Sequence, residues 1–229
     1  LKRKWKRITG NEEFKTYAFG IGVIAILVTI SVLVSLDENF EKSFRLALFQ
    51  VVSLVTTTGF VTADYVNWSN GLLMAFFMLL FTGACAGSTS GGIKVIRHLV
   101  FFKNSLLEFK RLLHPRAMLR VKVNKELIPG RVAAHVMVFL LVYLMVFCIG
   151  SILVMRLNGD VEKPFLTAIG SVATCLGNVG PGLGSVGPVN NFAHIPEASK
   201  ILLSFLMIVG RLELFSVLIL FAPSFWREN

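Results

Sequence analysis

Two strings that contain threonine and glycine each follow a short apolar run. In EKSFRLALFQVVSLVTTTGF, residues 41–60, the pattern Glu-Lys-x-Phe leads through the run to Ser-x-x-Thr-x-x-Gly. The segment EKPFLTAIGSVATCLGN, residues 162–178, has the same pattern, with a run that is three residues shorter. The alignment pairs Ser53 with Ser171, Thr56 with Thr174 and Gly59 with Gly177. Backbone carbonyls in such strings could replace the water around a dehydrated monovalent cation without adding a fixed charge.

The residues expected to supply these carbonyl oxygens form two sets. They are Thr56, Thr57, Thr58, Gly59 and Phe60 in the first string, and Thr174, Cys175, Leu176, Gly177 and Asn178 in the second. Glycine recurs whereas several side chains differ, which favours ligation by the backbone, and glycine permits angles that turn successive carbonyls toward one axis. The alternative is a glycine-containing turn that caps a helix. It would explain one copy well, but the match between two copies weighs against it.

The segments around the two strings are apolar enough to cross a membrane. Hydrophobic residues make up 55% of the chain and charged residues 16%, which a soluble domain of this length could hardly accommodate. A helix needs about 20 predominantly apolar residues to span a bilayer. The predicted spans are Ala18–Leu36, Gly71–Gly87, Val132–Met155 and Ile201–Phe221.

The runs Phe44–Val55 and Phe165–Ala173 are too short to span, and each lies between two predicted spans. We therefore predict a re-entrant helix in each of two repeats, with the string after it lining a pore, because non-helical backbone at membrane depth must be buried in protein or touch water. The C-terminal end of each short helix would carry partial negative charge inward, which favours cations.

The distribution of basic residues predicts the orientation of these spans. The first 15 residues carry six Lys and Arg, and residues 94–131 carry ten, whereas the two other connecting segments are poorer in basic residues. Because segments rich in Lys and Arg stay in the cytoplasm, both termini and the middle segment are expected inside. The formal net charge of +10 is thus mainly a topology signal, and no nucleic-acid partner is expected.

A glycine-rich run, GACAGSTSGGIK, ends the second predicted span. Four glycines weaken a helix there, since each costs roughly 1 kcal/mol relative to alanine. Close packing of small residues between helices is the alternative. A Walker-type phosphate loop would need Gly-Lys-Ser/Thr, but Ile93 precedes Lys94 and Val95 follows it, so nucleotide binding is not expected.

Arg211 lies within the fourth predicted span. A charge at that depth costs about 2.5–3.5 kcal/mol on insertion scales, so it normally faces a cavity or a partner and marks a functional path. Glu213 is two positions away and is a poor partner on the same helix. The alternative role for Arg211 is an ion pair with another span.

An enzyme is the alternative class of protein, and the sequence offers little for it. The three cysteines lie in apolar or glycine-containing segments, and the four histidines are scattered without the spacing of metal ligands. No pair of Asp residues and no Ser/His couple suggests catalysis within the membrane. We therefore expect transport rather than catalysis, without a cofactor.

The segment between the second and third predicted spans has an amphipathic pattern. Phe102, Leu106, Phe109 and Leu113 recur at helical spacing among basic residues. This predicts a cytoplasmic helix at the membrane surface that ends near Pro115. Contact with lipid headgroups and docking of a regulatory protein both remain open for it.

Four motifs together resemble the C-terminal half of TrkH-type subunits in the Trk/Ktr/HKT superfamily of cation-uptake proteins. The motifs are TTTGF, TCLGNVGPGLG, GACAGSTSGGIKVIR and GRLELF. The resemblance implies an all-α membrane protein with four span–pore-helix–filter–span repeats around one potassium-channel-like pore. This chain would hold repeats three and four, with the other two supplied by the same subunit. Glycine in each filter string goes with K⁺ in the family, but a Na⁺ or mixed-cation transporter stays open.

The same resemblance implies an organisation and partners. Residues 1–17 would be a basic cytoplasmic linker, 18–93 the third repeat, 94–131 an amphipathic cytoplasmic linker and 132–229 the fourth repeat. K⁺, held by the filter carbonyls, would be the transported ion. A homodimer in the bacterial inner membrane and a cytosolic nucleotide-binding ring of RCK domains, of the TrkA type, are the implied assemblies. The expected gate combines a pore-facing Arg211 with an intramembrane loop of Gly87, Ser88, Thr89, Ser90, Gly91 and Gly92.

Overall fold

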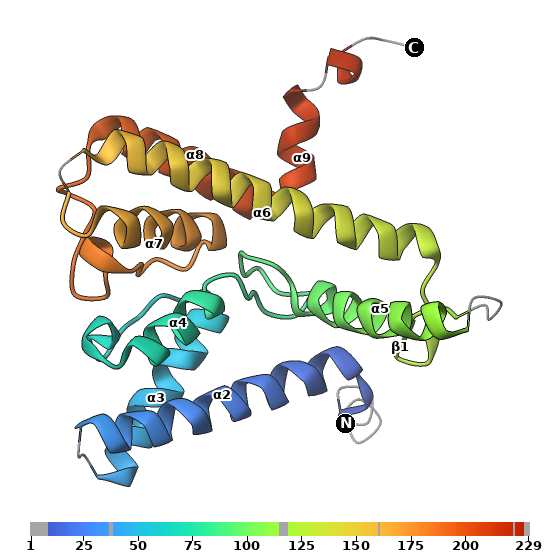
Figure 1. Cartoon of the computed structure of the whole chain (residues 1–229), viewed down its shortest axis with the longest axis horizontal. Helices are drawn as coiled ribbons and strands as arrows, with labels where there is room; N and C mark the ends of the chain where they lie inside the picture. The colour runs from blue at the N-terminus through green and yellow to red at the C-terminus, as the bar shows by residue number, and fades with distance from the viewer. Residues whose placement is uncertain (1–8, 37–38, 115–118, 160, 222, 227–229) are drawn as a thin grey trace.

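A computed structural model describes residues 9–36, 39–114, 119–159, 161–221 and 223–226. Two groups of helices face each other, with α2, α3 and α4 in one and α6, α7 and α8 in the other (Figure 1). Their bounds are Glu12–Leu36, Phe40–Val55 and Asn70–Leu79 for the first group, and Gly130–Asn158, Pro164–Gly177 and Glu197–Arg211 for the second. In each group a long helix is followed by a shorter one and then a loop, as expected for two repeats. Residues 1–8 of the predicted linker 1–17 lie outside the described residues, and α2 already begins within the linker, at Glu12.

Helices α2 and α6 are long and apolar enough to cross a membrane. They contain 25 and 29 residues, about 37 and 43 Å at a rise of 1.5 Å per residue. Their outer faces expose large apolar side chains, such as Phe19 and Val34 of α2 and Ile152 of α6. Lipid is the solvent that suits such faces.

The second predicted span, Gly71–Gly87, is wrong as one continuous helix. Helix α4 ends at Leu79, and the chain runs through a loop before α5, Val95–Leu113, begins. The loop closes on itself through backbone hydrogen bonds, since Gly83 N–H donates to the Ile93 carbonyl and Ile93 N–H to the Phe81 carbonyl. The helix therefore ends before Gly83, the first glycine of the run, and the backbone partners that it loses are replaced across the loop.

The fourth predicted span, Ile201–Phe221, is also broken. Helix α8 ends at Arg211, and the axis turns by 117° before α9, Leu214–Leu218, and the short η3, Ile219–Phe221. Glu213 stands at the break with a φ of 61°, in the left-handed region that a side chain disfavours. Hydropathy alone does not detect such a break, because the residues on both sides of it are apolar.

Helix α5 runs alongside α6 (Figure 1). The helix is confirmed, and its buried Val100 shares an apolar cluster with Ala133 of α6, while the predicted position at the membrane surface stays a prediction. It ends at Leu113, and Pro115 lies outside the described residues. A two-stranded hairpin, β1 Lys122–Val123 and β2 Glu126–Leu127, then leads into α6.

Each helix group has its own apolar core, and aromatic rings join the two. Buried Val51, Leu54 and Phe76 belong to the first core, and Val172 and Leu176 to the second. At the junction the rings of Phe81 and Phe147 meet edge to face, 4.9 Å apart. The short elements η1 Tyr65–Asn67, η2 Gly184–Val186 and η4 Pro223–Phe225 complete the described structure.

Candidate functional site

The first string folds back over the C-terminal end of α3. Thr57 and Gly59 have φ angles of 55° and 79°, so the chain reverses at both residues. Ser53 in the last turn of the helix holds the string: its carbonyl accepts from Thr58 N–H at 2.9 Å, and its hydroxyl donates to the Phe60 carbonyl at 2.6 Å. Gly59 suits this turn because only glycine adopts such angles without strain.

The second string lies one helical turn further along than predicted. Helix α7 continues through Gly177, whose φ is not positive, and the reversals occur at Asn178 and Gly180, with φ angles of 54° and 118°. Thr174 holds this string through its carbonyl, which accepts from Val179 N–H at 3.0 Å, and its hydroxyl, which accepts from Gly180 N–H at 2.9 Å. The prediction that Gly177 turns the backbone is therefore wrong. Thr174, Cys175, Leu176 and Gly177 form the last turn of α7.

The two strings correspond at a constant offset of 121 residues. Thr57 N–H donates to the Leu54 carbonyl at 3.0 Å, and Asn178 N–H donates to the Cys175 carbonyl at 3.1 Å. The same offset pairs Gly59 with Gly180, and it also pairs the two Glu-Lys-x-Phe motifs. The two repeats therefore align without a gap. The predicted alignment of the Ser, Thr and Gly residues, which needs a gap of three residues in the second apolar run, is wrong.

The two strings touch one another. A Cβ built on Gly59 would overlap the carbonyl oxygen of Val179, so only a hydrogen atom fits at this position. A cavity of about 570 Å³ lies beside both strings and is lined by Thr58, Val179 and residues of α8. Backbone carbonyls from two repeats are therefore brought together next to an open space.

The glycine-rich loop is seated against both strings. Gly91 N–H donates to the hydroxyl of Thr57 at 3.2 Å. A Cβ on Gly91 would overlap the carbonyl oxygen of Gly177, and a Cβ on Gly83 would overlap that of Gly91. Glycine is needed at these positions because the backbones approach so closely that a side chain would not fit. The weakening of a helix, on which the sequence prediction was based, does not explain this need. Loop and strings form one packed unit.

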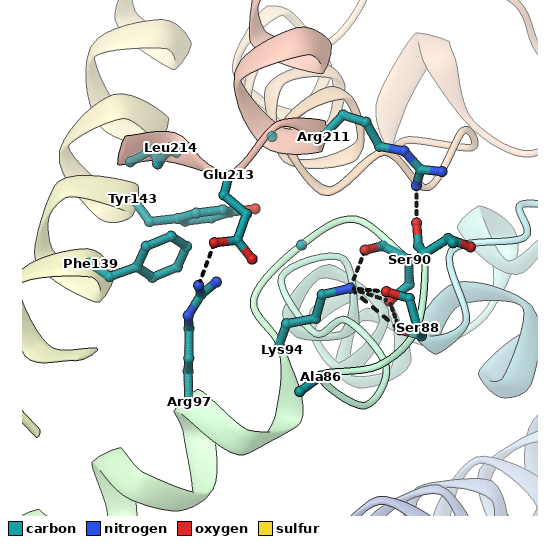
Figure 2. A pocket seen from close by; sticks show the side chains of 13 residues that line it. Ala86, Ser88, Ser90, Lys94, Arg97, Phe139, Tyr143, Arg211, Glu213 and Leu214 are labelled. Atoms are coloured by element: carbon teal, nitrogen blue, oxygen red, sulfur yellow. Dashed lines mark hydrogen bonds and ion pairs between the residues drawn. The ribbon is translucent and has the colours of Figure 1, made fainter. Parts of the chain in front are cut away.

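Lys94 ties the loop from within. Its Nζ donates to the carbonyls of Ser88 and Ser90 at 2.9 and 2.6 Å, and the two serine hydroxyls lie 2.8 Å apart (Figure 2). In the sequence, Lys94 was considered only as a possible phosphate-loop lysine, and its neighbours Ile93 and Val95 did not fit that motif. A lysine that follows a run of serine and glycine is the signal that could have suggested this role.

Glu13 ties the same loop to the first long helix. The residue is buried near the start of α2, and its Oε1 accepts from Ala86 N–H at 2.7 Å. Its position, 73 residues before Ala86, gave no sign of this contact in the sequence.

Replacement of Glu13 by alanine is expected to loosen the loop, because Ala86 N–H would lose its acceptor at a cost of about 1–3 kcal/mol. The free thiol of Cys85, next to this bond, reports the change. Its labelling by a thiol reagent, in full-length protein without other reactive cysteines, should become roughly ten-fold faster, as 1.4 kcal/mol corresponds to a factor of ten. Glu12→Ala is the matched control, because Glu12 pairs with Lys103 instead. Equal rates in the two variants would contradict the prediction.

Arg211 reaches the loop from α8. It is the last residue of that helix, and its Nη1 donates to the Thr89 carbonyl (Figure 2). The guanidinium lies beside a cavity of about 260 Å³ that the loop, α6 and the break after α8 enclose. Within the described residues no carboxylate lies within 4.0 Å of the Arg211 side chain, and the alternative of an ion pair with another span stays open.

Glu213 pairs with α5 and not with Arg211. Its carboxylate accepts from Arg97 at 2.9 Å, and the Arg97 guanidinium lies 3.9 Å from the centre of the Phe139 ring. This ion pair holds the break between α8 and α9 against α5 and α6. The contact joins residues 116 positions apart, so sequence spacing could not reveal it.

A family model described as TrkH, cation transport protein, matches residues 21–228. The chain belongs to the TrkH family. The Trk system potassium uptake protein TrkH of Salmonella typhimurium is 39% identical over 232 residues, which cover 100% of this chain and 45% of that protein. TrkG of Escherichia coli is 39% identical over 190 residues, 83% of this chain and 38% of TrkG.

The crystal structure of the potassium transporter TrkH from Vibrio parahaemolyticus matches with a TM-score of 0.88 and 36% identity, over 97% of this chain and 46% of that one. The predicted family and the all-α, potassium-channel-like membrane fold are confirmed. The chain spans less than half of the length of these TrkH relatives.

One contact in this member of the TrkH family bears on the enzyme alternative. His194 Nε2 lies 2.8 Å from Ser185 Oγ, a Ser/His couple that the sequence reasoning missed. Ser185 also bonds Thr167, and among the described residues no carboxylate orients the exposed His194, as a nucleophilic triad would require. The couple therefore fastens the segment after the second string to α7. The named relatives are transport proteins and not enzymes.

Proposed function

We propose that this chain supplies two quarters of a potassium-uptake pore in the bacterial inner membrane, and that it works by selective conduction. The observation that carries the proposal is a pair of strings with the same internal hydrogen bonds, at positions 121 residues apart. The two strings touch at Gly59 and Val179. A dehydrated cation needs several oxygen ligands, and two such strings present backbone carbonyls without fixed charge. We infer that the ion is K⁺ because these relatives are named as potassium transport proteins.

The proposed filter carbonyls belong to the non-helical part of each string. They are those of Thr57, Thr58, Gly59, Asn178, Val179 and Gly180. Ser53 and Thr174, which hold the strings in place, are positioning residues. Relative to the sequence prediction, the second set moves three residues toward the C-terminus.

The loop from Gly87 to Gly92 is the proposed gate. Its support is that Arg211 holds the Thr89 carbonyl while Gly91 N–H bonds the Thr57 hydroxyl of the first string. A fixed positive charge next to the ion path raises the barrier to cations. Movement of Arg211 away from the loop would have two effects at once: it would lower this barrier, and it would release the loop.

The rest of the pore is proposed to come from two further repeats of the same subunit, which the 45–46% coverage of the TrkH relatives supports. The basic segments favour cytoplasmic termini. The family resemblance is the basis for proposing a homodimer and a TrkA-type RCK regulator. K⁺ is the proposed transported ion.

Growth of a bacterium that lacks potassium uptake tests the proposed function. Full-length protein should restore growth at low K⁺, and Gly59→Ser should lower the preference for K⁺ over Na⁺, measured by competition in an uptake assay. Failure to restore growth, with Na⁺ uptake retained, would favour a Na⁺ or mixed-cation transporter of the same fold. An unchanged preference in Gly59→Ser would contradict the filter assignment.

A further inference from the structure

A cavity of about 300 Å³ between α5 and β1 gathers basic side chains from distant parts of the middle segment. Its lining residues are Lys103, Lys110, Arg120 and Lys122, with Leu106 and Leu107. No acidic residue contributes to the lining. The two lysines of α5 are seven positions apart and share one side of the helix, and the chain returns past them through Arg120 and Lys122.

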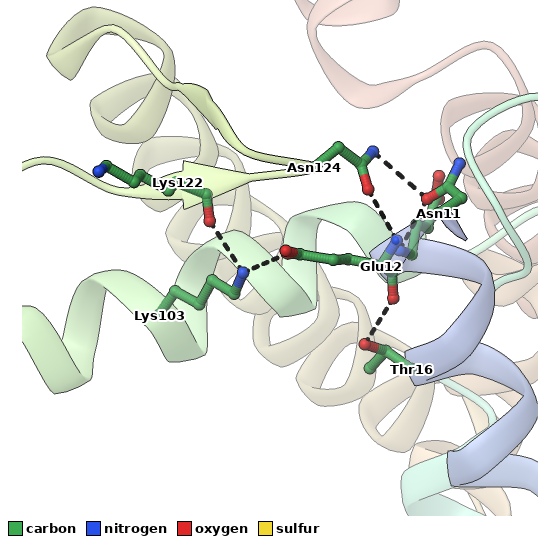
Figure 3. A network of polar contacts seen from close by, with 7 residues as sticks. Asn11, Glu12, Thr16, Lys103, Lys122 and Asn124 are labelled. Carbon is green, nitrogen blue, oxygen red and sulfur yellow. Dashed lines mark hydrogen bonds and ion pairs between the residues drawn. The ribbon is translucent and has the colours of Figure 1, made fainter. Parts of the chain in front are cut away.

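Polar contacts hold the wall of this cavity in place (Figure 3). Lys103 Nζ donates to the Lys122 carbonyl at 2.8 Å and pairs with the Glu12 carboxylate. Glu12 N–H donates to Asn124 Oδ1 at 2.7 Å, so the hairpin is attached to the first turn of α2 as well as to α5. A small apolar cluster that includes Val121 and Val123 packs below it.

Three positive charges around the cavity have no counter-charge in the part of the chain that the structure describes. Glu12 neutralises Lys103. Among the described residues, no carboxylate lies within 4.0 Å of the side-chain nitrogens of Lys110, Arg120 or Lys122. Uncompensated cations that converge on a preformed cavity raise the local concentration of anions, and a phosphate group suits such a set of nitrogen donors.

An apolar stripe continues from the cavity along α5. Phe102, Leu106, Phe109 and Leu113 are between 62% and 76% exposed and lie on one side of the helix, next to Lys103 and Lys110. The cavity sits where the apolar helices α2 and α6 begin, since Glu12 of α2 pairs with Lys103 of the lining and the hairpin leads directly into α6. A spanning helix enters the headgroup region of a bilayer at this level, and basic pockets there bind lipid headgroups.

We propose that this cavity binds the phosphate of an anionic phospholipid whose acyl chains lie along the apolar stripe of α5. The stripe favours a lipid over free phosphate, because soluble phosphate would leave those side chains in water. It also favours a lipid over an acidic protein surface, which would cover the cations but offer nothing comparable to the stripe. The site is separate from the strings and the loop, so it goes beyond the proposed function.

Lipid binding to the purified full-length protein tests the site directly. Phosphatidylglycerol in mixed micelles should displace a fluorescent anionic lipid more strongly than phosphatidylcholine does. In Lys110→Gln/Lys122→Gln the affinity for phosphatidylglycerol should fall by roughly 25-fold, since each basic side chain near an anionic surface contributes about five-fold. Lys103 is left unchanged because it holds the hairpin.

Lys125→Gln/Arg131→Gln is the matched control. It removes two exposed charges at the same end of the molecule that do not line the cavity, and it should retain most of the affinity. Equal losses in both variants would overturn the site in favour of diffuse attraction. Equal binding of the two lipids would overturn it as well, and displacement by inorganic phosphate as effective as that by phosphatidylglycerol would overturn the lipid assignment. Thermal unfolding of each variant separates lost binding from lost folding, and neither result depends on ion selectivity.

Discussion

Replacement of Gly180 by alanine is expected to reduce potassium uptake by the full-length protein by roughly 10- to 100-fold. The φ of 118° at Gly180 lies in a region that residues with a Cβ rarely adopt, and holding alanine there costs about 1–3 kcal/mol. The nearest atom to an added Cβ would be Gly59 Cα at 3.8 Å, an ordinary contact. The backbone would relax by rotating Gly180, which turns the neighbouring carbonyls away from their shared axis. Uptake of a radioactive K⁺ analogue into cells measures the effect.

Gly159→Ala is the matched control for this change. Gly159 also has a positive φ, 56°, and no atom lies within 4 Å of an added Cβ. It terminates α6 and lies outside both strings, 21 residues before Gly180, so the variant carries backbone strain without disturbing the proposed filter. Similar uptake by the two variants, at similar amounts in the membrane, would argue that Gly180 has no special role.

Replacement of Arg211 by alanine is expected to raise cation flux under conditions in which the wild-type pore is closed. The change removes a positive charge from the 260 Å³ cavity and the hydrogen bond to the Thr89 carbonyl. Hydrogen bonds to charged groups contribute about 1.5–3 kcal/mol, so the closed state should lose stability by about ten-fold or more. Flux into vesicles that contain the reconstituted full-length protein is the measurement, and unchanged flux would contradict the gating role.

Two further variants separate the causes of this effect. Arg211→Lys keeps the charge but shortens the side chain, so closed-state flux near the wild-type level would assign the barrier to charge, and flux near that of Arg211→Ala would assign it to the contact with Thr89. Arg156→Ala removes an exposed arginine from the last turn of α6 and should leave flux unchanged. A rise in flux with Arg156→Ala would mean that net charge, and not position, sets the barrier.

The position of the second string shows why residue matching missed the register. Matching of Ser, Thr and Gly tolerates a shift of one helical turn, because the same residue types recur along the end of α7. The spacing from Glu162 to Gly180 equals that from Glu41 to Gly59, and this spacing indicates the correct register better than the residue types do. Whether Gly177 ends the helix or continues it depends on the hydrogen bonds that the Thr174 carbonyl and hydroxyl accept, which only the structure resolves.

The broken helices show the limit of hydropathy. The stretches after Gly71 and Ile201 are apolar throughout most of their length, so composition predicts continuous spans. Continuity depends on backbone partners, and these come from far along the chain: Ile93 carbonyl and N–H close the glycine-rich loop, and Arg97 holds Glu213 at the break after α8.

The sequence by itself determined the family, the membrane character, the two repeats and the glycine at the first reversal. These properties depend on composition, on motifs and on local backbone preferences, all of which act over a few residues. The register of the second string, the breaks in two spans and the contacts of Glu13 and Arg211 with the loop became visible only in the tertiary structure. The last group depends on which segments meet in space, and local preferences do not encode which of the distant polar groups becomes the partner of each exposed backbone atom.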